Sequence, residues 1–385
     1  MTTKGTAVLR VHNEKRIMSF LRQNKTTSRQ AIADSLGISK NTVSIIIEKL
    51  LKEGVVSESG IDQGEVGRPR IELSLIAKAY QVIGILIRDT CCEIVVTDYS
   101  GNIMESEAVE VNAKMASLCL NLLAERCQRL IRKYDRVIGI GIAVPGLVDP
   151  TSGLVHYSTH LEWEGIPVMQ VIQQHVTPIP VRVLNRVKAA SLSRFKVTPD
   201  NSSSTFYIRV DEGVGGAFVI GNEIYHGTSW TAGEVGHLPV ATDGPRCICG
   251  QHGCLEALVS IPAVRRQLKA RIPDRDIDIT ADGIIIPPSL SDYPEFHAVM
   301  DDVGAYVGVA LSTVINLLNP QVIVVDSPYS NIPTFGSATI KTAGTKALQY
   351  PLKNTQIVFV NTVHSSAIGV ALAVILGFEN TSGDA

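Results

Sequence analysis

Four potential metal ligands lie close together in the second half of the sequence. They are one imidazole and three sulfurs, from His237, Cys247, Cys249 and Cys254. Tetrahedral zinc prefers this ligand set, and four protein ligands leave no position open for water. Gly250 and Gly253 permit the backbone reversals that return the third thiolate to the first two. The spacing therefore predicts a structural zinc; the alternative is three buried cysteines beside an unrelated histidine.

Two carboxylates flank this cluster. Glu234 lies three residues before the histidine, and Glu256 lies two residues after Cys254. Carboxylates that are held near one another in a cleft accept hydrogen bonds from vicinal hydroxyl groups. The pair therefore indicates a polyol ligand such as a sugar. The alternative is that each glutamate is a solvated surface charge.

The chain is long enough for more than one domain. Its 385 residues are 45% hydrophobic, enough for two or three cores. No apolar run reaches the roughly 18 residues of a membrane span, and the polar first residues lack the apolar core of a signal peptide. We therefore expect a cytoplasmic protein with no membrane partner. A reducing compartment also suits the four remaining cysteines, which lie in apolar runs: Cys91, Cys92, Cys119 and Cys127.

Charge is distributed unevenly along the chain. Residues 1–70 carry twelve Lys and Arg against seven Asp and Glu, a net charge of +5. Because the whole chain carries −2, the remaining residues carry −7. We call residues 1–70 the head and the rest of the chain the body. A basic head before an acidic body is expected where only the head binds a polyanion.

Three short helices are predicted in this head. The first spans residues 13–23, the second is capped by Ser28 and ends at Gly37, and the third runs from Ser39 to Gly54. The glycine turn between the second and third helices is typical of a helix-turn-helix motif. The start of the third helix would then contact base edges and phosphates through Ser39, Lys40, Asn41, Thr42 and Ser44.

Two short strands, at residues 55–56 and 71–73, predict a wing after these helices. The loop between them carries Arg68 and Arg70 on either side of a proline, an arrangement suited to phosphate or minor-groove contact. The head is therefore predicted to bind DNA. The alternative is a three-helix module for protein interaction.

From Tyr80 onward, short β-branched runs alternate with longer helical segments, which predicts an α/β architecture. The expected strands lie at 82–87, 93–97, 137–144, 206–210, 216–220 and 321–325. The expected helices lie at 117–133, 303–318 and 367–378.

The glutamates and the metal ligands resemble the signature of the ROK family of repressors and sugar kinases, Glu-x-Gly-His followed by Cys-x-Cys-Gly-x-x-Gly-Cys-Leu-Glu. In that family the histidine and the cysteines hold zinc, and the glutamates and the histidine bind a sugar. The resemblance spans essentially the whole chain. It implies an α/β fold in which an N-terminal winged helix-turn-helix is followed by a two-lobed actin/hexokinase-like (ribonuclease H-like) sugar-kinase fold. The implied domains are a DNA-binding domain at 1–75, a first lobe at 76–200 to which a C-terminal helix at 365–385 returns, and a second lobe with the zinc loop and sugar site at 201–364.

The kinases of this fold share four elements from which the present sequence departs. Their Asp-x-Gly-Gly-Thr phosphate loop corresponds to Leu-Ile-Arg-Asp-Thr at 86–90, and their Gly-Thr-Gly-x-Gly-Gly loop to 211–216, which begins with two acids. Acids repel phosphate there. A Gly-Gly pair has become Asp326-Ser327, and the catalytic Asn-Asp-Ala-Asn has become Asn-Arg-Val-Lys at 185–188. An arginine cannot replace the aspartate as general base, because its guanidinium does not deprotonate. We therefore expect no kinase activity.

Arg186 stands where the enzymes hold the aspartate that faces the phosphate-accepting hydroxyl. A cation at that place suggests a ligand that already carries a phosphate or carboxylate. The alternative is that Arg186 neutralises Glu234 or Glu256.

Together these patterns predict a transcriptional repressor whose head binds operator DNA and whose body binds a sugar or sugar phosphate without phosphorylating it. By resemblance, the sugar contacts are Asn185, Arg186, Glu234, His237 and Glu256. Recognition of two half-sites requires a homodimer or a homotetramer. Two other functions remain open: a sugar kinase fused to a DNA-binding head, and a regulator whose ligand is a protein.

Overall fold

The computed structural model describes residues 2–62, 70–193, 204–221, 223–273, 278–280, 283–285 and 293–380. These form two compact units. The first comprises Met1–Leu184 and Ala367–Ala385, and the second comprises Asn185–Ser366. The chain therefore crosses between the units twice.

The head contains the three predicted helices, α1 (Thr2–Gln23), α2 (Arg29–Leu36) and α3 (Lys40–Lys52). The predicted caps are confirmed. Ser28 accepts a hydrogen bond from the amide of Ala31, and Gly37 ends α2 with a left-handed φ of 65°. Aliphatic side chains from α2 and α3 are fully buried between the helices, among them Ile32, Val43 and Ile46. The first helix is longer than predicted.

The predicted wing is also present. Strands β1 (Val56–Asp62) and β2 (Arg70–Leu75) pair antiparallel, with Val56 opposite Leu75. Thr27 and Leu73 exchange two backbone hydrogen bonds, of 2.7 and 3.1 Å, which attach the wing to the start of α2. The loop at 63–69, with Arg68, lies outside the described residues, as does the side chain of Arg70.

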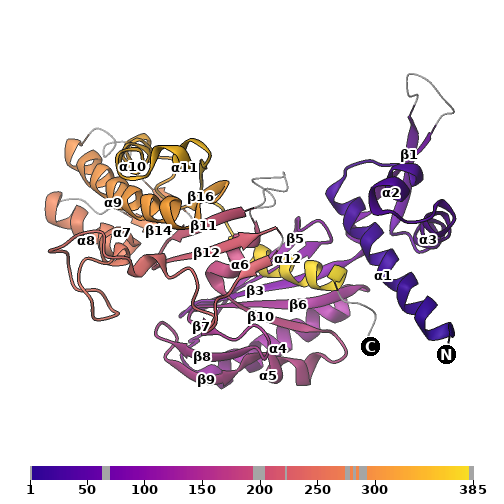
Figure 1. Cartoon of the computed structure of the whole chain (residues 1–385). Helices are drawn as coiled ribbons and strands as arrows, with labels where there is room; N and C mark the ends of the chain where they lie inside the picture. The colour runs from indigo at the N-terminus through magenta and orange to yellow at the C-terminus, as the bar shows by residue number, and fades with distance from the viewer. Residues whose placement is uncertain are drawn as a thin grey trace. The chain divides into compact units, whose positions relative to one another are not determined.

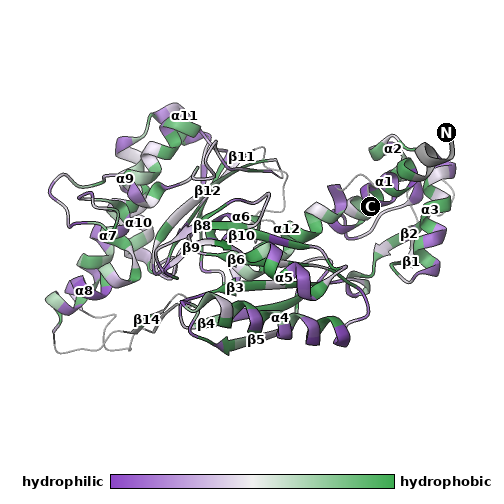
Figure 2. Cartoon of the chain, turned by 90° about the horizontal axis from the view of Figure 1, so that it is seen from below, coloured by the Kyte–Doolittle hydropathy of each residue, from purple (hydrophilic) through white to green (hydrophobic). Residues whose placement is uncertain are grey.

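The first unit holds a five-stranded sheet (Figure 1). Its strands, in spatial order, are β10 (Val181–Asn185), β6 (Val137–Val144), β3 (Gln81–Ile87), β4 (Cys91–Asp98) and β5 (Ile103–Glu110). The central strands are buried on both faces, and Figure 2 shows them largely in the hydrophobic colour. Ile83, Ile85 and Ile87 pack on helices α4 (Ala116–Lys133) and α5 (Val168–Val176).

Helix α12 (Ser365–Asn380) covers the opposite face of this sheet (Figure 1). Successive strand residues point to opposite faces, so Gly84 lies on the side away from its isoleucine neighbours. A Cβ on Gly84 would collide with the carbonyl oxygen of Ala367, and a Cβ on Gly141 would lie 2.5 Å from that of Val370. The glycines therefore permit the backbone of α12 to approach the sheet.

Smaller elements complete the first unit. They are the helical turn η1 (Ala77–Ala79) and a three-stranded sheet of β7 (Leu147–Val148), β8 (Leu154–Ser158) and β9 (Trp163–Pro167).

The second unit holds another five-stranded sheet. Its strands, in spatial order, are β13 (Glu223–Tyr225), β12 (Val214–Ile220), β11 (Ser204–Val210), β16 (Val322–Asp326) and β17 (Gln356–Val360). One face packs on helices that share the main core, α7 (Leu255–Val259), α8 (Ile261–Arg271), α9 (Pro294–Leu318) and α10 (Pro333–Lys346). Residues of α6 (Arg186–Leu192) cover Tyr207 and Val324 on the other face.

Smaller elements of this unit include α11 (Gln349–Lys353) and the paired strands β14 (Asp278–Thr280) and β15 (Gly283–Ile285). Within the described ranges, only α9 is long and apolar enough to span a membrane, and 61% of its apolar window is buried inside the protein. A core helix has this composition, so α9 is weak evidence for a membrane span. The two α/β sheets with a winged helix-turn-helix confirm the predicted fold class.

The close approach of α12 to the sheet can be tested at Gly141. Replacing Gly141 with Ala should lower the free energy of unfolding by about 1–3 kcal/mol, because the new methyl group must displace helix backbone. Gly336→Ala, in α10, is the control: nothing lies within 4 Å of its Cβ position, and alanine should stabilise the helix by up to about 1 kcal/mol. Urea unfolding followed by circular dichroism would measure both. Equal midpoints for the two variants would contradict this packing.

Candidate metal centre and ligand site

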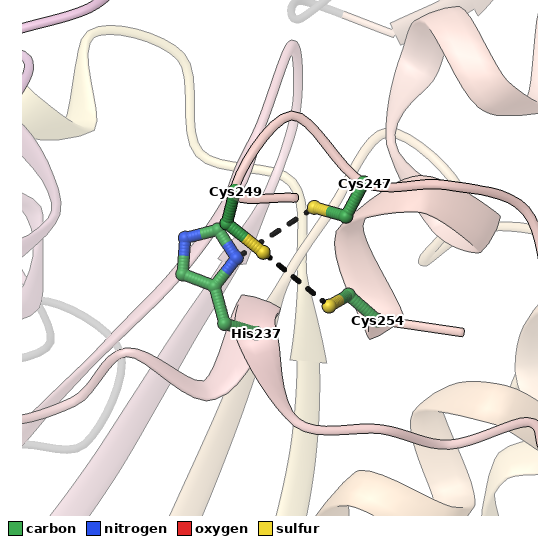
Figure 3. Close-up of side chains that lie close together, drawn as sticks. All are labelled: His237, Cys247, Cys249 and Cys254. Carbon is green, nitrogen blue, oxygen red and sulfur yellow. Dashed lines mark hydrogen bonds between the residues drawn. The ribbon is translucent and has the colours of Figure 1, made fainter. Parts of the chain in front are cut away.

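The four predicted metal ligands converge in the second unit. His237 lies in the helical turn η3 (Val235–His237), Cys247 and Cys249 lie in the following loop, and Cys254 caps α7. One ligand atom from each lies within 4.8 Å of all the others. Figure 3 shows the four side chains turned toward one another. Cys247 and Cys254 are buried, whereas Cys249 is exposed.

The distances within this cluster fit a tetrahedral ion. The Cys247 Sγ atom lies 3.8 Å from His237 Nδ1, and the two other sulfurs lie 3.7 Å apart. Metal bonds of about 2.0–2.3 Å place tetrahedral ligands roughly 3.3–3.8 Å from each other. Gly250 and Gly253 take the left-handed backbone expected of them, with φ of 92° and 69°. The donor set and its spacing therefore suit a metal ion.

Both candidate sugar-binding carboxylates lie beside predicted metal ligands. Glu234 immediately precedes η3, and its Oε2 atom lies 4.0 Å from Nε2 of His237. Glu256 follows Cys254 in the first turn of α7, where its Oε2 atom accepts a hydrogen bond of 2.9 Å from the amide of Val214. A metal that fixes the loop would fix both carboxylates.

Asn185 and Arg186 lie at the junction of β10 and α6. The Oδ1 atom of Asn185 caps the helix by accepting hydrogen bonds from the amides of Val187 and Lys188, at 2.9 and 3.2 Å. Arg186 forms a two-pronged ion pair with Asp211, with N–O distances of 2.9 and 3.0 Å. Its observed partner is therefore Asp211, one of the two acids of the altered phosphate loop, and not Glu234 or Glu256.

A second arginine, which sequence analysis missed, shares the same carboxylate. Arg209 binds Asp211 at 3.3 Å and Asp326 at 2.7 Å, and Asp326 also accepts a hydrogen bond from the hydroxyl of Tyr207. Burial acts to lower the pKa of Arg209, but the carboxylate of Asp326, followed by Tyr207 and Asp211, raises it above its ordinary value. The only available sequence signal was a charge inside the apolar run of β11.

Lys188 is another buried cation that the sequence analysis did not assign. Its ammonium group donates to the carbonyl oxygen of Trp230, which has a left-handed φ of 59°. Burial lowers the pKa of Lys188, and the nearby carboxylate of Glu234 offsets part of this effect. Because Trp230 lies four residues before Glu234, the lysine supports the loop that presents this carboxylate.

The predicted DNA-contact residues cluster at the start of α3. Ser39 is its N-cap, and its hydroxyl accepts from the amide of Thr42 at 3.2 Å. Ser39, Lys40 and Asn41 are exposed, whereas Thr42 and Ser44 are half-buried. This surface presents polar groups and a lysine at a helix N-terminus, where phosphate is favoured.

Comparison with known proteins places the chain in a family. A model described as the ROK family matches residues 82–377. The chain belongs to the ROK family. A second model, described as winged helix-turn-helix DNA-binding, matches residues 12–57 and agrees with the head seen in the structure.

Two named regulators resemble the chain over most of its length. The xylose repressor of Bacillus subtilis (strain 168) is 28% identical over 318 residues, 81% of each chain. The DNA-binding transcriptional dual regulator NagC of Escherichia coli (strain K12) is 25% identical and covers 93% of this chain and 90% of its own.

Solved structures show the same fold. A ROK family transcriptional regulator, described as a homologue of the E. coli MLC protein, has a TM-score of 0.78 at 21% identity and covers 97% of both chains. A ROK glucokinase from Streptomyces griseus, in complex with glucose and AMPPNP, has a TM-score of 0.65 at 22% identity. It covers 76% of this chain and 98% of its own.

The supporting role of Lys188 can be tested by Lys188→Met, which keeps the length of the side chain. Loss of a charged hydrogen bond of about 1.5–3 kcal/mol should raise amide hydrogen exchange in residues 228–237 at least about tenfold. Lys114→Met, which removes an exposed ion pair with Glu162, should leave this segment unchanged. Unaltered exchange in Lys188→Met would show that the lysine does not hold the loop.

Proposed function

We propose that this chain is a sugar-responsive DNA-binding repressor that binds its effector without phosphorylating it. One observation carries the second half of this proposal. Arg186 stands at the place of the family's catalytic aspartate and is paired with Asp211, an acid in the altered phosphate loop. The guanidinium of Arg186 cannot act as a general base, and the carboxylate of Asp211 repels phosphate in the loop. Both residues therefore oppose phosphoryl transfer.

The head binds operator DNA in this proposal. The contacts are Ser39, Lys40, Asn41, Thr42 and Ser44 of the recognition helix, with Arg68 and Arg70 of the wing. The DNA-binding domain at residues 1–75 reads one half-site. The protein therefore acts in the cytoplasm as a homodimer or a homotetramer on an approximately palindromic operator. The names of the similar proteins, a xylose repressor in B. subtilis and a DNA-binding transcriptional dual regulator in E. coli, support this function.

In this proposal the effector is a sugar whose contacts lie mainly in the second lobe, residues 201–364, which follows a first lobe at residues 76–200. Asn185, Glu234, His237 and Glu256 contact its hydroxyl groups, and Arg186 lies beside them. Because both Nη atoms of Arg186 already bind Asp211, a phosphate on the ligand would have to compete with a carboxylate. We therefore favour a neutral sugar over a sugar phosphate.

Zinc is the metal that best suits one imidazole and three thiolates. In this proposal His237, Cys247, Cys249 and Cys254 hold it, and with four protein ligands it is structural. Bound zinc would fix the loop that carries Glu256 and the turn that carries His237.

The metal proposal predicts about one zinc per chain by mass spectrometry of the purified protein. Cys249→Ala should lose the ion, unfold at a lower temperature and bind sugar more weakly, because the loop loses its closure. Cys91→Ala changes a thiol outside the cluster and should retain the metal. A Cys249→Ala protein with wild-type zinc content and wild-type sugar response would contradict the assignment.

The function itself is tested with DNA from upstream of the protein's own gene. We expect submicromolar binding, weakened by about 1–3 kcal/mol in an Asn41→Ala variant. A panel of D-xylose, D-glucose and N-acetyl-D-glucosamine, each beside its phosphate ester, should contain a neutral sugar that releases the DNA. Consumption of ATP in the presence of any of these sugars would show instead a kinase with a fused head. Absence of DNA binding would refute the proposal of a repressor. Release of the DNA by a protein partner, without any sugar, would favour a regulator whose ligand is a protein.

A further inference from the structure

Helix α12 joins the two units of the chain by covalent continuity. Its first two residues, Ser365 and Ser366, belong to the second unit, and from Ala367 onward it belongs to the first. An α-helix of 16 residues is a stiff rod about 24 Å long. A displacement of its first turn is therefore carried along its length.

The first turn of this helix is held by the same arginine that holds the altered phosphate loop. Nη1 of Arg209 donates to the carbonyl oxygen of Thr362 and to the hydroxyl of Ser365, each at 3.2 Å. Asp326 reinforces the contact by accepting from the amide of Thr362 at 3.0 Å. Arg209 is only 5% exposed, so these bonds are shielded from water.

This arginine also connects to the proposed sugar site. Asp211, its ion-pair partner, accepts a hydrogen bond from the amide of Gly213 at 3.2 Å. The next amide, of Val214, donates to Glu256. A ligand hydroxyl that binds Glu256 therefore alters the hydrogen bond between Glu256 and the amide of Val214. Val214 belongs to the loop that begins at Asp211, and Asp211 holds Arg209. The change is thereby passed to the first turn of α12, which Arg209 contacts.

The last turn of α12 is attached to the DNA-binding head. The carboxylate of Glu379 receives four hydrogen bonds: two from Arg22 at 2.7 and 2.8 Å, one from Ser19 at 2.9 Å and one from Tyr99 at 3.0 Å. Arg22 and Ser19 belong to α1, the first helix of the head. The side chain of Glu379 is 3% exposed. A buried, two-pronged arginine–carboxylate pair fixes distance and orientation together.

Helix α1 in turn is tied to the recognition helix. The ammonium group of Lys49, in α3, lies 2.7 Å from the carboxylate of Glu14 in α1. The orientation of α1 on α12 therefore sets the orientation of α3.

We propose that Glu379 is a positioning residue for the head, and that α12 couples the proposed effector site, through Arg209 at its first turn, to the DNA-binding surface, through α1 at its last turn. This inference rests on the proposed function and identifies the residues that connect its two halves. Loss of the carboxylate charge leaves the guanidinium of Arg22 buried without its counter-charge, and the head is then no longer fixed on α12.

The experiment compares wild type with Glu379→Gln and with the milder Tyr99→Phe and Ser365→Ala. Amide hydrogen exchange in residues 15–23 should rise at least about tenfold in Glu379→Gln and by less in Tyr99→Phe. In all three variants, the factor by which the releasing sugar of the panel weakens binding to the upstream DNA should fall at least about fivefold toward one. Sugar affinity without DNA, measured by calorimetry, should stay within about twofold of wild type, which a general loss of structure would not allow.

Two matched variants serve as controls. Glu107→Gln removes the charge of a surface ion pair with Arg129, and Ser312→Ala removes a hydroxyl that bonds within α9. Both should keep wild-type exchange and wild-type release. Wild-type amide hydrogen exchange in residues 15–23 of Glu379→Gln would overturn the proposal. Unchanged release of DNA by the sugar in both Glu379→Gln and Ser365→Ala would also overturn it. Failure of the wild-type protein to bind DNA or to respond to a sugar would refute the proposed function instead, and exchange would still decide the role of Glu379.

Discussion

The carboxylate of Asp211 is shared between the guanidinium groups of Arg186 and Arg209, and the half of the second unit that carries the proposed ligand contacts depends on this arrangement. All three side chains are largely buried, and a buried charge is tolerated only when it is paired and hydrogen-bonded. Arg209 extends the series to Asp326. Charges of alternating sign therefore join the start of α6 to the ends of β11 and β16. Within the second unit, this network connects three elements that different segments of the chain supply.

Local interactions were the part of the structure that the sequence predicted best. The caps at Ser28 and Gly37 depend on a few neighbouring residues. The four side chains of the predicted metal cluster lie within one short segment, so their types and spacing were sufficient to predict that they converge. The partner of Arg186 could not be found in this way, because Asp211 comes from another strand and approaches only when the sheet forms. The role of Lys188 was hidden for the same reason: its acceptor is a backbone carbonyl of a distant loop.

A shared fold leaves the function of the chain open. The glucokinase from S. griseus shares the fold of the body at 22% identity, so the function must be argued from the side chains of this chain. These side chains depend on one another. Arg186 without Asp211 would be a buried cation without a partner, and Asp211 without the arginines would be a buried carboxylate. Restoring an aspartate at position 186 alone would set two carboxylates together. In the proposed regulator, which does not phosphorylate its ligand, catalysis would therefore require several simultaneous changes at this site.

The unequal exposure of the three cysteine ligands has a physiological consequence if zinc is bound as proposed. Cys247 and Cys254 are enclosed, but Cys249 faces solvent beside Ile248, which is 71% exposed. Chelators, electrophiles and thiophilic heavy metals would reach the ion from this side first. The response to the sugar would then depend on how much zinc the cell can supply. In a cell short of zinc, or exposed to thiophilic metals, the regulator would no longer respond to its sugar.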